Sequence, residues 1–187
     1  HDTLAAIRGF HVTRLEWAWI RGPQFSARLW DSGRLFGAAA SSALSHIAAT
    51  AEDTDYTSLA CVNLDGGPVI PTWKRAWKPP GNLWMCVNNP ELERRYVAYL
   101  QSCLDTGAQV LQRDEPGGNT HAVHWGGCFC DHCMRQFRVF LSEQTTPEQR
   151  AQLEIGGAAD FDYREHLRRH DAPVGDAHGQ PAALHRL

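Results

Sequence analysis

The sequence predicts an α/β protein, because segments with strand character alternate with segments of helical periodicity. β-Branched and aromatic residues indicate strands at 10–17 and 34–40, and a third apolar run at 108–113 has the same character. Apolar residues at helical spacing indicate helices at 91–104 and 133–143. This order is typical of a (β/α)8 barrel, which needs about 250 residues. The chain has 187 residues, so we expect only the first half of such a barrel, with roughly four strands.

The segments between these elements carry their own signals. Residues 4–9 read as the end of a helix closed by a glycine, and the alanine-rich run 42–50 predicts another helix. Residues 56–63 lead into Asp-Gly-Gly at 65–67, a hairpin signal. Asn89 and Pro90 predict the start of the helix that runs through 104, as cap and first position.

Two parts of one domain are expected. Residues 1–143 would form the N-terminal part of the barrel, and residues 144–187 a polar tail, helical or poorly ordered, with one helix near 161–170. The sequence begins with His1 rather than Met. Because a half barrel leaves sheet edges and core open, we expect a longer parent chain or a homo-oligomer.

Composition limits the classes of partner. The hydrophobic fraction is 43%, the net charge is −3 and the pI is about 6.4. No basic stripe indicates nucleic-acid binding, and no run approaches the roughly 18 apolar residues of a membrane span. We therefore expect neither partner. No signal peptide is visible, and a thiol-based metal site suits a cytoplasmic or a periplasmic or secreted bacterial-type protein alike.

Three cysteines lie within six residues, at positions 128, 130 and 133. Cysteines this close rarely pair with each other as disulfides, whereas thiolates are the preferred ligands of structural zinc. A tetrahedral site needs a fourth ligand, and Cys86, Cys103 and His132 are candidates. Cys86 precedes a helix cap, Cys103 falls on the apolar face of its helix, and His132 would strain the loop. Four thiolates leave no open position, so the site is predicted to be structural.

An acidic pair, Asp114-Glu115, follows the apolar run 108–113 and precedes Pro116-Gly117-Gly118. It reads as a strand end that opens into a loop, where barrel enzymes carry their carboxylates. A neighbouring Asp114 carboxylate would raise the pKa of Glu115, as a general acid requires. The plainer alternative is a loop carboxylate in a salt bridge with Arg113.

Three stretches together resemble the family 42 β-galactosidases and related barrel glycosidases. They are Cys86-Val87-Asn88-Asn89-Pro90-Glu91, then Gln112-Arg113-Asp114-Glu115-Pro116-Gly117, then the segment from Cys128-Phe129-Cys130-Asp131-His132-Cys133 through Arg138. The resemblance covers 84–141 well and 4–20 weakly. It implies a retaining glycoside hydrolase acting on a carbohydrate, with Glu115 as acid/base. It also implies a structural Zn2+ held by Cys86, Cys128, Cys130 and Cys133.

Two departures from that family pattern stand out. Asp114 occupies the position of an Asn that binds the sugar 2-hydroxyl, so it would accept but not donate a hydrogen bond. The family nucleophile lies on the seventh strand, which no part of this sequence provides. A retaining pair needs two carboxyls about 5.5 Å apart, so a non-catalytic, zinc-stabilised carbohydrate-binding or assembly module is the alternative function.

Further residues are candidates for substrate binding. Arg14 and Glu16 would line a sugar pocket at the first strand, or form an ion pair there. Aromatic faces stack on sugar C–H surfaces, and Trp73, Trp77 and Trp84 fall in an irregular stretch; core or surface packing is the alternative for each. His121 would reach substrate if its loop folds over the barrel mouth. A metal hydrolase using Asp114, His121 and His124 is a weaker hypothesis.

Overall fold

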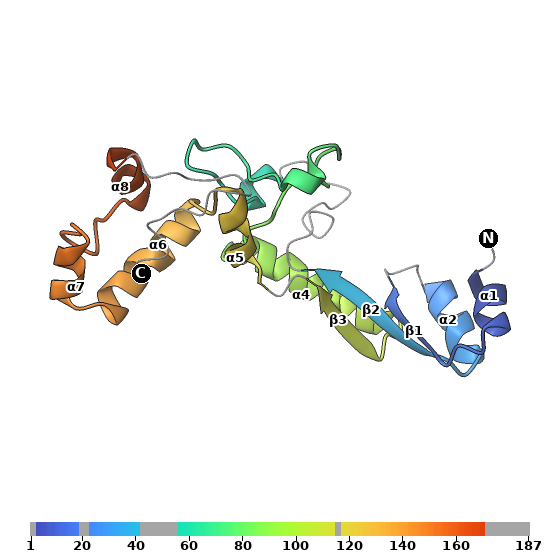
Figure 1. Cartoon of the computed structure of the whole chain (residues 1–187). Helices are drawn as coiled ribbons and strands as arrows, with labels where there is room; N and C mark the ends of the chain where they lie inside the picture. Colours follow the sequence, from blue (N-terminus) through green and yellow to red (C-terminus); the bar gives the residue numbers. More distant parts are fainter. Residues whose placement is uncertain (1–2, 19–22, 42–55, 115–116, 171–187) are drawn as a thin grey trace.

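The computed structural model describes residues 3–18, 23–41, 56–114 and 117–170 (Figure 1). Its strands are β1 (Arg14–Ala18), β2 (Leu35–Ser41) and β3 (Val110–Asp114). Its helices are α1 (Thr3–Gly9), α2 (Pro23–Asp31), α4 (Pro90–Asp105), α5 (Asn119–Ala122), α6 (Asp131–Gln144), α7 (Pro147–Gln152) and α8 (Tyr163–Arg169). Short 3-10 turns cover Thr57–Leu59, Thr72–Lys74 and Val123–Trp125.

The three strands form one parallel sheet in the order β1-β2-β3. The register runs from Gly37 opposite Val110 to Ser41 opposite Asp114, so β2 and β3 end side by side. Parallel strands need crossover connections, and α4 supplies one before β3. The mixed α/β class is therefore confirmed.

The prediction of half a (β/α)8 barrel is wrong. The described residues contain three strands in a small open sheet. The stretch expected to be a hairpin at 56–70 forms isolated antiparallel bridges instead of a strand pair: Ala60 to Met85, Val62 to Pro68 and Asn63 to Gly127. Gly66, Gly67 and Pro68 interrupt any longer ladder, because Pro lacks the donor and Gly lacks a side chain to pack. This stretch braces neighbouring loops instead of extending the sheet.

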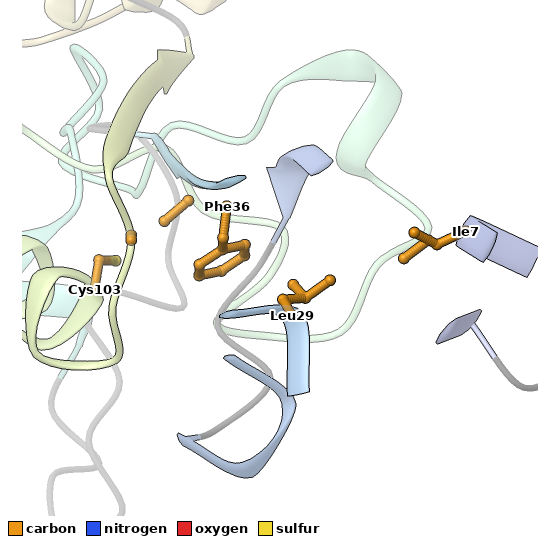
Figure 2. Packing of buried hydrophobic residues seen from close by; sticks show 6 residues of the cluster. Ile7, Leu29, Phe36 and Cys103 are labelled. Atoms are coloured by element: carbon orange, nitrogen blue, oxygen red, sulfur yellow. The ribbon is translucent and has the colours of Figure 1, made fainter. Parts of the chain in front are cut away.

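The sheet packs on helices through one apolar cluster: Ile7, Leu29, Phe36, Ala38, Cys103 and Ala108. Figure 2 shows Phe36 of β2 between Leu29 of α2 and Cys103 of α4. Helix α4 begins as expected, with Pro90 in its first turn and the Asn89 side chain accepting from the Glu91 N–H at 3.0 Å. No helix is predicted from the sequence at α2, whose Leu29 completes this cluster.

A second group of elements, α6, α7 and α8, lies at the other end of the molecule from the sheet (Figure 1). Tyr163 and Leu167 of α8 are buried against Phe129 and Met134. The helix expected near 161–170 is thus present and packed, and α7 was not foreseen. Residues 171–187 and the helix expected at 42–50 lie outside the described residues. Within the described ranges, no helix has both the length and the apolar character needed to cross a bilayer.

Candidate metal centre

The four cysteines expected to bind zinc come from two stretches far apart in the sequence. The backbone N–H of Cys86 donates to the carbonyl of Leu59 at 2.9 Å, which pins the first stretch just before α4. The second stretch leads into α6: Cys130 is its N-cap and Cys133 lies in its first turn. The N–H of Phe129 donates to the Val62 carbonyl at 2.7 Å. Residues 59–62 therefore hold both stretches in place.

The sulfur atoms are arranged as a four-coordinate site requires. The Sγ of Cys86 lies 3.5 Å from the Sγ of Cys130 and 3.5 Å from that of Cys133. All four Sγ atoms, including that of Cys128, lie within 4.8 Å of one another. A tetrahedron with metal–sulfur bonds near 2.3 Å has edges of about 3.8 Å. The prediction that these four cysteines meet is confirmed, and together they can bind one metal ion such as zinc.

The structure also decides between the candidates for the fourth ligand. Cys103 is buried in the sheet cluster with Phe36, away from this group. The Nδ1 of His132 faces the Arg135 guanidinium at 2.7 Å. Among the described residues, the group close enough for one ion consists of the four cysteines alone. Cys61 is buried beside them, as core, with its thiol 3.4 Å from Asn119 Oδ1.

Nitrogen donors contact the sulfurs of Cys86, Cys128 and Cys133. The Asn119 Nδ2 lies 3.2 Å from the Sγ of both Cys86 and Cys133. Its Oδ1 accepts from the Val87 N–H at 3.0 Å, which fixes the orientation of the amide. The Val62 N–H also donates to Cys128 Sγ at 3.4 Å. Such donors offset the negative charge of thiolates and orient them for the metal.

Sequence reasoning missed Asn119, because nothing in cysteine spacing marks an amide that reaches the sulfurs from α5. Replacing Asn119 with Asp keeps the shape and the acceptor for Val87 but puts a carboxylate oxygen beside two thiolates. We expect zinc affinity to fall by about 10–100-fold, measured by competition with a chromogenic chelator. The control is Thr120→Ala, which changes an exposed neighbour whose hydroxyl donates to the Gly117 carbonyl. Equal affinity in both variants would contradict the role of Asn119.

Without a cation the four thiols share protons unequally. Hydrogen bonding, first from Cys128, lowers the pKa of Cys86 and of Cys130. The pKa of Cys128 is raised chiefly by its hydrogen bond with Cys130, and that of Cys133 chiefly by its hydrogen bond with Cys128. Four adjacent thiolates repel one another, so the last protons leave only when a cation replaces them. The cluster therefore has the chemistry of a metal site.

The structure brings some of the expected substrate-binding residues to the metal centre. Trp84 is 1% exposed, and its Nε1 donates to the Gly118 carbonyl at 3.2 Å. The centre of the His121 ring lies 6.0 Å from that of the Trp84 ring. His121 also lies against Gly117, since a Cβ added to this glycine would come within 2.6 Å of the His121 Nε2. Both side chains thus lie beside the loop that follows Asp114.

The other candidates are dispersed. Asp114 ends β3 opposite Ser41, and Glu115 lies outside the described residues. Arg14 and Glu16 form an ion pair on β1, which β2 separates from the strand that carries Asp114. Trp73 is half exposed in a surface turn.

Comparisons with known proteins give no relative for this arrangement. No protein-family model, no curated protein and no solved structure matches the chain.

Proposed function

We propose that this chain is the zinc-stabilised part of a glycoside hydrolase, in which zinc braces the loop that follows the acidic strand end. The observation that carries the zinc site is the approach of four sulfurs to within 4.8 Å of one another. Cys86, Cys128, Cys130 and Cys133 would hold the ion, and four thiolates leave it no position for substrate. When bound, zinc supplies a cross-link and not reaction chemistry.

The short distance in sequence between the metal centre and the acidic pair Asp114-Glu115 supports the proposal of a hydrolase. Asn119, which contacts two of the sulfurs, stands five positions after Asp114 in the sequence. In parallel sheets, ligands bind outside the carboxyl ends of the strands, and Asp114 ends β3 beside the end of β2. A bound ion beside Asn119 would limit the conformations open to the chain that carries the acidic pair, as the precise placement of an acid–base group requires.

The proposed roles of the two acids follow from their chemistry. Glu115 would protonate the glycosidic oxygen as the bond breaks and would then remove a proton from the attacking water. Asp114 would accept a hydrogen bond from a sugar hydroxyl. The nucleophile is a further carboxylate, which the acidic pair does not supply.

Glu115→Gln tests the hydrolase. In the full-length protein we expect kcat for a nitrophenyl β-galactoside to fall by about 10²–10⁴-fold, because the amide cannot transfer the proton. Zinc content should stay at the wild-type value. Glu93→Gln, which changes an exposed carboxylate in the first turn of α4, is the matched control and should keep full activity. Undiminished hydrolysis in Glu115→Gln would exclude this role.

The second candidate is a non-catalytic carbohydrate-binding or assembly module stabilised by zinc. Its specific support is the pair of half-exposed tryptophans, Trp73 and Trp77, on the surface. Saccharide binding by a wild-type protein that shows no hydrolysis would select this candidate.

A further inference from the structure

The stretch from Gly66 to Pro90 has a charge opposite to that of the whole chain. It contains no Asp or Glu, while the chain as a whole carries −3. Its three cations, Lys74, Arg75 and Lys78, fall within five residues. Arg75 and Lys78 are exposed. Neither forms an ion pair with any residue that the structure describes. A positive surface with uncommitted charge is therefore available to an anion.

The third cation is buried beneath aromatic rings. The Lys74 side chain is 0% exposed, and its Nζ lies 5.0 Å from the centre of the Trp73 ring, 5.7 Å from that of Trp77 and 5.4 Å from that of Trp84. The same Nζ reaches the Leu83 carbonyl at 3.5 Å. An ammonium over several indole faces attracts each ring. The Lys74 ammonium thus stabilises the positions of the Trp73 and Trp77 rings from their buried side.

Those two outer rings reach the solvent. Trp73 is 51% and Trp77 49% exposed, and their rings meet edge to face, 5.3 Å apart at 88°. Large aromatic side chains held rigid at a surface lose little entropy when a ligand binds. Arg75 lies between them in the sequence and Lys78 directly follows Trp77. Aromatic faces and free cations therefore share one short surface turn.

We propose that Trp73, Trp77, Arg75 and Lys78 form a binding surface for an acidic saccharide, one that carries carboxylate or sulfate groups. This inference rests on the proposed carbohydrate-active function and names its class of ligand. An indole face stacks on the C–H face of a sugar ring, and the guanidinium fork of Arg75 pairs with a planar anion such as a carboxylate.

The observations favour a saccharide over a single-stranded nucleic acid. Nucleic-acid-binding domains are strongly basic, whereas this chain has a pI of about 6.4. Successive bases stack on rings along a groove, and two rings at 88° do not offer parallel platforms.

The test is isothermal titration of the full-length protein with four probes. They are an oligogalacturonate, a sulfated oligosaccharide, a neutral galacto-oligosaccharide and a single-stranded oligonucleotide. We expect one of the two acidic saccharides to bind, at least 10-fold more tightly than the neutral one, and to weaken as salt rises. The comparison of oligogalacturonate with the sulfated probe identifies the anionic group.

Variants locate the surface. Trp73→Ala and Arg75→Ala should each weaken binding by at least 10-fold, and Trp73→Phe should restore part of it. The matched controls are Trp30→Ala and Arg28→Ala on α2, where Trp30 is 52% exposed; both should bind as the wild type does. Circular dichroism would verify that every variant is folded.

Three results would overturn the proposal. They are equal affinity for neutral and acidic saccharides, binding of the oligonucleotide alone, and acidic binding that survives both Trp73→Ala and Arg75→Ala. The proposed hydrolase activity is tested separately. If acidic saccharides bind but are not cleaved in a Glu115-dependent way, the binding surface is supported and the proposed enzymatic activity is excluded.

Discussion

Cys133→Ser is expected to reduce bound zinc from one ion per chain to none and to unfold the region around the metal centre. The Sγ of Cys133 is 3.5 Å from that of Cys86 and accepts hydrogen bonds from the side chains of Asn88 and Asn119. Its loss would therefore remove one metal ligand and weaken both hydrogen bonds. Apparent binding energies of structural zinc reach about 10 kcal/mol or more at neutral pH. The whole stability of a typical domain is about 5–15 kcal/mol. Loss of the ion therefore removes most of the stability of this region.

Elemental analysis and thermal unfolding would measure this effect, and chelation of the wild type should reproduce it. Cys103→Ala is the control, because Cys103 is also a cysteine but is buried in the sheet cluster, outside the metal centre. It should retain one zinc per chain. A Cys133→Ser protein that keeps zinc and its thermal midpoint would show that Cys133 is not a ligand, and a wild type without zinc would show that the thiols form ordinary core.

Trp84→Ala is expected to lower the free energy of unfolding by about 3–5 kcal/mol, the cost of emptying a large buried aromatic site. Trp84 is among the largest fully buried side chains, and its ring packs 5.0 Å from that of Trp125. The mutation also leaves the Gly118 carbonyl without its indole donor. Urea unfolding monitored by circular dichroism would give the change directly.

Trp73→Ala is the control for Trp84→Ala, since it removes the same side chain from an exposed position in contact with the same lysine. Its cost should be less than about 1 kcal/mol. If the two substitutions cost the same, the packing of Trp84 in this core would be disproved. If Trp84→Ala instead leaves stability unchanged and weakens saccharide binding, its sequence-based interpretation as a sugar-stacking residue would be favoured over a role in packing.

Elements whose structure depends on a short stretch of sequence could be predicted from local signals. Asn89 and Pro90 start α4, and the helical spacing of its apolar residues predicted the rest of the helix from neighbours a few positions apart. Cys103 of this helix lies in the sheet cluster, whereas Leu92 packs against Leu59 and Met85. The three closely spaced cysteines and Cys86 also gave a correct cluster, although the choice of Cys86 leaned on a family resemblance. Elements defined by one strong local pattern were therefore predictable.

The remainder depended on contacts between distant residues. Residues 59–63 alternate like a strand, yet they pair singly with three different partners, 68–69, 84–86 and 127–129. No local pattern distinguishes these single bridges from a hairpin, so the barrel prediction counted a strand at 56–63 that does not form. Asn119 was not predicted for the same reason, because its role depends on its contacts with the sulfurs of Cys86 and Cys133, which are distant in the sequence or on another element.

The position of β3 between the metal ligands has a consequence for the order of folding. Cys86 precedes β3 in the sequence and Cys128 follows it, roughly forty positions apart, so a bound ion closes a loop that contains both α4 and β3. Closing this loop would lower the conformational entropy of the unfolded chain around α4 and β3, and would thereby favour the folded state. During synthesis the last ligand, Cys133, is made after α4 and β3. A metal centre with all four thiols would therefore be completed only after the residues of α4 and β3 have been synthesised.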